Sequence, residues 1–430
     1  MSSLDSPPIR VGVLGCGTVG GSLIDLIQRD ADTIRDRTGV QLEVTRVAVR
    51  NLSAERSVVL PDGVLTRDAS GLVADPEVDV VVETIGGIEP ARQLLLDALK
   101  AGKPVVTANK ELVANVGAEL FAAAAAGGVD IMFEAAVAGG IPLIRALRES
   151  LIGERLTRLM GIVNGTTNFI LTKMTEEGAD YGEVLAEAQR LGYAEADPTA
   201  DVEGFDAGAK AAILATIAFG ARVVAGDVFQ EGISKVTPAD IAAAASMGHV
   251  IKLLAVVERE EGEIAVRVHP TMVPDSHPLA SVRDSFNAVF LEGEAVDDLM
   301  LYGRGAGGFP TASAMLGDLI GASRNLQRSV ADGFGHLSDA VIRPIDETSS
   351  AFYLQLDVND QPGVLAAVAG IFGEHGVSIR SMEQEGHGDT AHLVFITHSA
   401  READVQSTIR DLRELDQVRD IGALIRVIGD

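Results

Sequence analysis

Short apolar runs and helical patterns alternate along the first third of the chain. Apolar runs lie at residues 9–14, 42–49, 78–84, 104–110 and 129–137, and a helical pattern at 89–101. A nearly continuous apolar run such as VDVVVET (78–84) is typical of a parallel strand that helices cover on both faces. The alternation predicts an α/β domain with a Rossmann-type, doubly wound sheet over residues 1–137.

A second pattern begins near residue 350, after a stretch without regular spacing. Residues 331–349 favour neither strand nor helix, which is typical of a linker. A strand, a helix, two strands, a helix and a strand then follow, at 350–358, 359–376, 377–386, 391–398, 401–415 and 422–429. The order βαββαβ is that of the split βαβ fold, so residues 350–430 are predicted to form a C-terminal domain.

Composition limits the possible partners. The chain has 430 residues, 47% of them hydrophobic, which is enough for two or three domains with cores of their own. The net charge of 35 − 62 = −27 disfavours binding to nucleic acid or to an anionic membrane. The longest apolar stretch, 211–226, is shorter than the roughly 20 residues of a membrane span. We see no secretory signal and only one cysteine, so we expect a cytoplasmic protein without an internal disulfide.

The sequence GCGTVG follows the first predicted strand and opens a helical pattern. G-x-G-x-x-G is a weak motif alone, but between a strand and a helix it predicts a dinucleotide site. Gly15 would allow the tight turn, Gly17 would let the backbone approach a pyrophosphate, and Gly20 would let helix and strand pack closely. The amides of Thr18 and Val19 would attract the phosphate charge. Cys16, inside the turn, is predicted to be a packing residue.

Three polar residues follow the predicted parallel strands, at the edge where doubly wound folds bind ligands. Arg50 follows the second strand, where it would accept the 2′-phosphate of NADP or allow both NADP and NAD; the alternative is a surface arginine. Thr84 ends the third strand and would line the same cleft, unless it only caps the strand. Lys110, in TANK, follows the fourth strand.

The motifs GCGTVG, VTANK, FEAAVAGGIPLI, NGTTNFIL and GYAEADPTADVEGFDAGAK occur in this order between about residues 9 and 325. In this order they resemble homoserine dehydrogenase, a family that interconverts L-homoserine and L-aspartate 4-semialdehyde with NAD(P). The resemblance implies a substrate domain over 138–300 of α+β type, which also serves dimerisation, and a segment over 301–330 that returns to the nucleotide domain. The weaker alternatives are a dehydrogenase of another semialdehyde and a non-catalytic amino-acid sensor.

The resemblance also implies roles for the residues of the acidic stretch 191–210. Lys210 would be the proton donor, while Glu195 and Asp206 would bind the substrate. Asp206 and Lys210 are four residues apart, so on a helix they share one face; a surface salt bridge is the alternative. Contacts with the cofactor would come from Lys110, Gly192 and Gly305.

FEAAVAGGIPLI combines one carboxylate with a glycine-rich turn. The Glu134 carboxylate and the main-chain carbonyls of Val137, Gly139 and Ile141 suit a hard cation of low charge, sodium or potassium. The family has such a monovalent site. The alternative is a buried glutamate that caps a turn. The histidines are scattered and no cluster has zinc spacing, so we predict no transition metal.

The sequence DQPGVLAAVAGIF in the C-terminal domain resembles the ACT domain, a module that senses amino acids. The resemblance implies an effector site at Asn359, Asp360, Gly363 and Val364, with L-threonine as the expected ligand. The alternative is a domain used only for assembly. We expect a homodimer or homotetramer.

Overall fold

The structure is a computed structural model that describes residues 7–335 and 337–428. The chain divides into two compact units, each built from three segments. Unit 1 comprises Met1–Leu156, Ala209–Asp227 and Glu292–Ala340; unit 2 comprises Thr157–Gly208, Val228–Leu291 and Val341–Asp430. Both units are discontinuous along the chain, and the third segment of unit 1 includes residues 301–330, the segment expected to return to the nucleotide domain.

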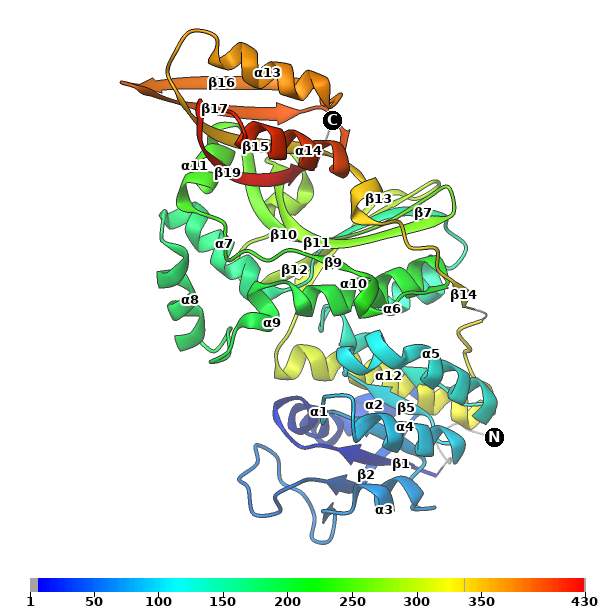
Figure 1. Ribbon diagram of the computed structural model, residues 1–430. Helices are drawn as coiled ribbons and strands as arrows, with labels where there is room; N and C mark the ends of the chain where they lie inside the picture. Colours follow the sequence, from blue (N-terminus) through cyan, green and yellow to red (C-terminus); the bar gives the residue numbers. More distant parts are fainter. Residues whose placement is uncertain (1–6, 336, 429–430) are drawn as a thin grey trace. The chain divides into compact units, whose positions relative to one another are not determined.

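Unit 1 contains a sheet of six parallel strands in the order β3-β2-β1-β4-β5-β6. This is the strand order of the dinucleotide-binding doubly wound fold, and it confirms the predicted fold class. The strands are β1 (Ile9–Leu14), β2 (Leu42–Ala48), β3 (Leu65–Thr66), β4 (Val80–Glu83), β5 (Val105–Thr107) and β6 (Ile131–Met132). Figure 1 shows them in blue and cyan.

Helices cover this sheet because their apolar faces match it. In α1 the buried Leu23, Ile24 and Ile27 follow helical spacing and pack with Val11 and Val13 of β1 in one core. The chain returns to this core through α12, whose apolar face completes it. The helices of unit 1 are α1 (Thr18–Arg29), α2 (Ala31–Thr38), α3 (Ala69–Ala74), α4 (Ala91–Lys100), α5 (Lys110–Gly127), α6 (Leu143–Arg145) and α12 (Gly308–Arg328).

The strand predicted at 129–137 is much shorter than expected. Only Ile131–Met132 pairs with β5, and Glu134–Ala136 forms a 3-10 turn. The backbone then reverses through Ala138 and Gly139, whose φ angles of 54° and 36° are incompatible with a strand. The apolar composition of this segment therefore reflects burial in a turn rather than membership of the sheet.

In unit 2 the larger sheet of the chain runs in the order β12 (Phe286–Gly293), β7 (Leu156–Ile162), β10, β11, β19, β15, β17 and β16. The strand that follows β12 in the sequence, β13 (Asp297–Arg304), belongs to the third segment of unit 1. The centre of the larger sheet is the long antiparallel hairpin of β10 (His249–Glu260) and β11 (Glu263–Pro274). The two-residue turn at Glu261 and Gly262 has φ angles of 53° and 90°, which suit such hairpins. The helices outside the C-terminal module are α7 (Gly165–Glu177), α8 (Tyr181–Arg190), α9 (Thr199–Val202) and α11 (Pro238–Ser246), while α10 (Phe205–Phe219) runs from unit 2 into unit 1.

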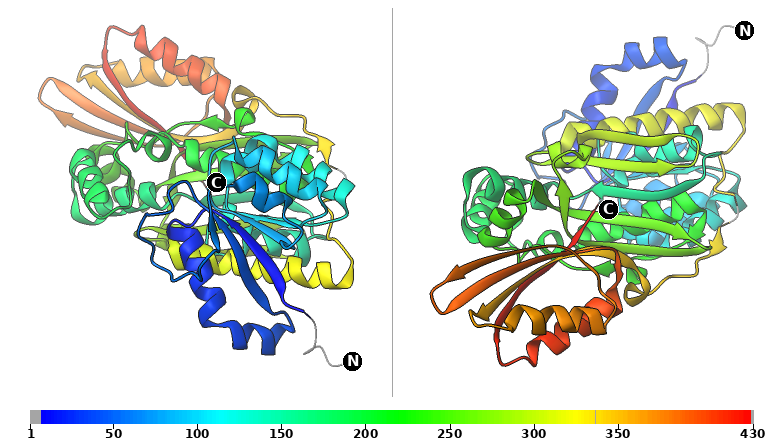
Figure 2. Two further views of the ribbon diagram at one scale, coloured as in Figure 1. Left: turned by 90° about the horizontal axis from the view of Figure 1, so that it is seen from below. Right: turned by 90° about the horizontal axis from the view of Figure 1, so that it is seen from above.

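The predicted βαββαβ order is confirmed at the C-terminal end, as Figures 1 and 2 show in orange and red. Phe352, Phe372 and Phe395 are almost fully buried in its core. The elements are β15 (Ser349–Asn359), α13 (Val364–Glu374), β16 (Ile379–His387), β17 (Thr390–Thr397), α14 (Glu402–Arg413) and β19 (Val418–Val427).

Three parallel contacts cover one edge of β11. Near the start of β11, Ile264 bridges to Ile342. The middle of β11 pairs with β9 (Phe229–Gln230), and near the end of β11 Thr271 pairs with Arg426 of β19. The Arg426 guanidinium is buried and holds Glu402 of the same module in a double hydrogen bond of 2.9 and 3.0 Å. The sheet of the module and the β10–β11 hairpin are therefore one continuous sheet.

The segment predicted as a linker is held at several points. Ser338 and Asp339 (β14) pair with Ala221 and Arg222 (β8), and Arg343 forms an ion pair with Glu263 at 3.0 Å. Single pairings of this kind leave no periodic pattern, which is why the sequence showed none. In the part of the chain that the structure describes, no helix combines the length and apolar character needed to span a bilayer.

Candidate active site

The turn between β1 and α1 depends on three glycines. Gly15 has a φ of 100°, and a Cβ there would lie 2.7 Å from Oγ1 of Thr84. A Cβ at Gly20 would lie 2.5 Å from the Gly15 carbonyl oxygen. Gly17, in contrast, faces open space with no atom within 4 Å of such a Cβ. Gly15 and Gly20 are therefore required by packing, while Gly17 leaves room for a pyrophosphate beside the amides of Thr18 and Val19, the first residues of α1.

Thr84 supports this turn from β4. Its hydroxyl lies 3.1 Å from the Leu14 carbonyl oxygen and 3.2 Å from that of Gly15, so it donates a hydrogen bond to the glycine turn. Its established contact is thus with the backbone that would hold the cofactor. Direct contact with the cofactor stays a prediction.

The loop after β2 contains a second arginine that the sequence analysis missed. Arg50 is exposed, as the NADP prediction requires. Arg56 donates hydrogen bonds to the carbonyl oxygens of Asn51 and Ala54 at 2.5 and 2.7 Å and so holds the loop together. Burial raises the pKa of the nearby Cys16 thiol, and the charge of Arg56 opposes that shift. The sequence does contain a sign of this role, because Arg56 is a second arginine in the same short polar segment as Arg50.

The start of α5 is anchored by two polar residues that the sequence analysis did not single out. Asn109 caps the helix by accepting a hydrogen bond from the Leu112 amide at 3.1 Å. The fully buried carboxylate of Glu83 accepts hydrogen bonds from Thr107 Oγ1 and from the amides of Ile85 and Gly86, at 2.5 to 2.9 Å. Lys110 is the first residue of α5, so its backbone position is well defined.

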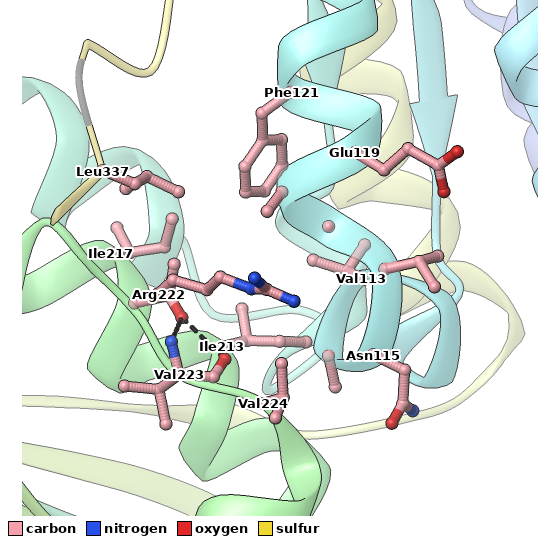
Figure 3. A pocket seen from close by; sticks show the side chains of 15 residues that line it. Val113, Asn115, Glu119, Phe121, Ile213, Ile217, Arg222, Val223, Val224 and Leu337 are labelled. Atoms are coloured by element: carbon pink, nitrogen blue, oxygen red, sulfur yellow. Dashed lines mark hydrogen bonds between the residues drawn. The ribbon is translucent and has the colours of Figure 1, made fainter. Parts of the chain in front are cut away.

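A cavity of about 140 Å³ lies between α5 and the part of α10 that belongs to unit 1. Figure 3 shows the side chains that line it. Apolar side chains such as Val113 and Ile213 form its walls, and the Arg222 guanidinium points between them. Val113 lies three residues after Lys110, and Ile213 three residues after Lys210. Lys110 and Lys210 therefore each lie one helical turn from a residue that lines this cavity.

Two carboxylates of the acidic stretch, Asp201 and Asp206, meet near the start of α10. Asp206 and Lys210 lie one turn apart on this helix, as predicted, and Asp206 is only 6% exposed. The side-chain amide of Asn164 donates hydrogen bonds to Asp201 at 2.7 Å and to Asp206 at 2.8 Å. Asn164 lies in the NGTTNFIL motif, but no sequence pattern connected it to these carboxylates.

Glu195 and Gly192 lie in the loop that follows α8, and both are exposed. Gly192 has a φ of 77°, which favours glycine. The loop is held to the start of α7 because Thr166 Oγ1 donates a hydrogen bond to the Tyr193 carbonyl oxygen at 2.7 Å. Glu195 and Gly192 therefore lie on a segment that is tied to the helix that carries Asn164.

The Glu134 carboxylate caps a turn, which was the alternative to cation binding. Oε1 accepts a hydrogen bond from the Ile144 amide and Oε2 one from the Arg145 amide, both at 2.8 Å. Burial raises the pKa of Glu134, and the backbone donors oppose that shift. The carbonyl-bearing residues Val137, Gly139 and Ile141 lie in the reversal that follows. Gly305 packs closely against Gly139, because a Cβ at Gly139 would lie 2.5 Å from the Gly305 carbonyl oxygen.

The predicted effector turn joins β15 to α13. Gly363 precedes the first residue of the helix, Val364, and its φ of 92° explains the glycine. Asp360 donates its amide to the Asp389 carbonyl oxygen at 3.0 Å, and the Asn359 side chain accepts a hydrogen bond from Arg419 at 2.5 Å. The four residues are thus brought together in one turn at the start of a helix.

Three family models match the chain. Residues 15–134 match the homoserine dehydrogenase NAD-binding domain, residues 142–320 match homoserine dehydrogenase, and residues 352–417 match the ACT domain. Together these matches account for most of the described residues.

Curated relatives and solved structures agree with these models over the full length. A homoserine dehydrogenase of Corynebacterium glutamicum is 52% identical over 98% of this chain and 96% of its own length. One of Bacillus subtilis is 44% identical, covering 98% and 99%. The crystal structure of a homoserine dehydrogenase from Thiobacillus denitrificans has a TM-score of 0.93 at 44% identity, covering 98% and 99%. A hyperthermophilic archaeal homoserine dehydrogenase in complex with NADPH has a TM-score of 0.65 at 30% identity, covering 74% and 98%.

Proposed function

Because the chain belongs to the homoserine dehydrogenase family and is an NAD(P)-dependent oxidoreductase, we propose that Lys210, Asp206 and Glu195 carry out its reaction on L-homoserine and L-aspartate 4-semialdehyde. The observation that supports this most is the start of α10. There the buried Asp206 carboxylate, held by Asn164, lies one helical turn before Lys210.

Each of these residues matches one charged or reacting part of the substrate. The carboxylates of Asp206 and Glu195 bind the ammonium group of the amino acid. In the direction of reduction, the Lys210 ammonium gives a proton to the aldehyde oxygen; in the direction of oxidation, the lysine takes the proton from the hydroxyl. The bound NAD(P) supplies or accepts the hydride. Lys110, at the start of α5, contacts the cofactor and substrate.

We propose that NADP is the preferred cofactor. Gly17 and the start of α1 offer space and amides for the pyrophosphate. The exposed guanidinium of Arg50 would pair with the 2′-phosphate, and Arg56 gives the loop a fixed shape. The relative solved with NADPH supports this choice.

We propose further that a monovalent cation, sodium or potassium, binds the carbonyl oxygens of Val137, Gly139 and Ile141. Main-chain carbonyls in a left-handed turn suit such an ion. Glu134, which the sequence analysis took as a carboxylate ligand, would act mainly by holding the turn through the amides of Ile144 and Arg145.

The ACT domain favours regulation by an amino acid. We propose L-threonine as the effector, bound at Asn359, Asp360, Gly363 and Val364, and a cytoplasmic homodimer or homotetramer as the active form. The position of the four residues at the start of α13 supports the effector site, because a helix N-terminus attracts a carboxylate.

One assay tests the proposal. Purified protein should oxidise NADPH in the presence of L-aspartate 4-semialdehyde, and Lys210→Ala should lower turnover by roughly 100-fold or more, the usual contribution of a general acid. The matched control is Lys173→Ala, which removes another helical lysine with an i,i+4 carboxylate, Glu177, at 2.7 Å. If Lys210→Ala turns over as fast as the control, Lys210 is not the proton donor.

A further inference from the structure

Asn164 uses its whole side chain on three fixed partners. Nδ2 lies 2.7 Å from Asp201 Oδ1 and 2.8 Å from Asp206 Oδ2. Oδ1 accepts a hydrogen bond from the Thr167 amide at 2.8 Å and so caps α7. The residue is 5% exposed. Two donors and one acceptor are therefore all engaged in a buried position.

These partners determine which way the amide points. If Oδ1 and Nδ2 exchanged places, the oxygen would face two carboxylates and the NH₂ group would face the Thr167 N–H. Both contacts would be repulsive, so only the observed orientation is stable. The residue thus connects the start of α7 with two carboxylates that follow it by 37 and 42 positions.

We propose that Asn164 is a positioning residue for the dehydrogenase reaction. It holds the Asp206 carboxylate in the orientation that receives the substrate ammonium, and it keeps Asp201 beside it. This inference rests on the proposed role of Asp206. A neutral amide is suited to the task because it orients two carboxylates without adding a positive charge, whereas a lysine or arginine there would compete with the substrate ammonium for Asp206.

The part of α7 that carries Asn164 is itself held in place. Asn168 donates to the Val282 and Phe286 carbonyl oxygens at 3.3 and 3.2 Å, and the buried Lys252 ammonium donates to Asn168 Oδ1 at 3.0 Å. At Gly165 a Cβ would lie 2.7 Å from the Ser285 carbonyl oxygen. This support explains how a single side chain can fix the Asp206 carboxylate with precision.

Asn164→Asp separates positioning from capping. Aspartate has the same shape and caps helices as well as asparagine, so α7 keeps its cap. The ionised side chain has no N–H, however, and it adds a third carboxylate beside Asp201 and Asp206. We expect kcat/KM for L-homoserine to fall by about 100-fold, the size typical of a displaced binding group, with KM for NADP unchanged.

The pH profile provides a second readout. Neighbouring carboxylates raise the pKa of an introduced carboxyl group, and its protonated form can again donate a hydrogen bond. The ratio of Asn164→Asp activity to wild-type activity should therefore rise as the pH is lowered from about 8 towards about 5.5. A residue that only capped α7 would produce no such rise.

Two further variants complete the test. Asn164→Ser keeps a capping oxygen but cannot reach both carboxylates, so KM for L-homoserine should rise by at least about 10-fold without the pH-dependent recovery. Asp180→Asn, at the N-cap of α8, is the control and should leave KM unchanged. Because Asn164→Ser adds no charge, it keeps the inference testable even if Asn164→Asp does not fold.

Asp206→Asn distinguishes this inference from the function on which it rests. If that variant binds L-homoserine normally, the proposed role of Asp206 fails. If Asp206→Asn raises KM while both Asn164 variants keep wild-type KM and pH profile, the positioning role alone is overturned.

Discussion

Glu134→Gln tests whether this carboxylate caps a turn or binds a cation. Each carboxylate oxygen accepts one backbone amide at 2.8 Å. Glutamine offers a single acceptor oxygen, so its NH₂ group would face either the Ile144 or the Arg145 N–H. One buried amide would lose its partner, which costs about 1–3 kcal/mol of unfolding free energy. For a domain of 150–250 residues this corresponds to a fall in Tm of roughly 2–4 °C per kcal/mol.

The assay is thermal unfolding in sodium, potassium and choline chloride at equal ionic strength. If the carbonyl oxygens bind the cation, sodium or potassium should raise the Tm of the wild type and of Glu134→Gln by the same amount. Glu149→Gln, an exposed carboxylate that pairs with Arg145 at 3.3 Å, is the control and should change Tm little.

Two results would refute this reasoning. A Tm for Glu134→Gln equal to that of Glu149→Gln would show that the two hydrogen bonds do not stabilise the turn. Loss of the sodium effect in Glu134→Gln alone would make the carboxylate a cation ligand.

Other predictions address the cofactor, the buried lysine and the effector. Arg50→Asp should raise KM for NADPH far more than KM for NADH, because a carboxylate repels the 2′-phosphate; equal changes would make Arg50 a surface residue. Burial lowers the pKa of Lys252 from 10.5 to about 8, so the unfolded chain binds more protons between these values and this group adds stability as the pH rises through them. Denaturant titrations should show the unfolding free energy of the wild type rising relative to that of Lys252→Met over that pH range. If the difference between the two unfolding free energies does not change with pH, burial does not lower the pKa of Lys252. Asp360→Ala should shift the inhibition of the enzyme by threonine to higher threonine concentrations, with sedimentation used to check that the oligomeric state is unchanged. An inhibition curve equal to that of the wild type would place the effector site elsewhere.

The sequence predicted features that arise from local patterns. The glycine turn at Gly15, Gly17 and Gly20 is encoded within six residues, and steric rules determine its shape. The βαββαβ order followed from apolar periodicity, because each of its strands and helices buries one face. Asp206 and Lys210 share a helical face for the same kind of reason, a spacing of four residues.

What the sequence did not predict depends on contacts between distant residues. The Asn164 amide meets Asp201 and Asp206 only because α9 and the first turn of α10 lie beside the start of α7, and nothing in NGTTNFIL indicates this. Glu134 was open to two interpretations because its partners, the amides of Ile144 and Arg145, are backbone groups that carry no sequence signal. Arg56 and Glu83 likewise bind backbone atoms, so their roles appear only in the folded chain.

The pairing of β19 with β11 has a consequence for synthesis of the protein. A growing chain completes the β10–β11 hairpin long before β19 is made, since the paired residues Thr271 and Arg426 lie 426 − 271 = 155 positions apart. Until then the end of β11 remains an open edge, which can pair with other chains. A product that stops before β19 keeps that edge and leaves Glu402 without Arg426. We therefore expect chaperones and proteases to bind such fragments more readily than the full chain, in which β19 covers this edge.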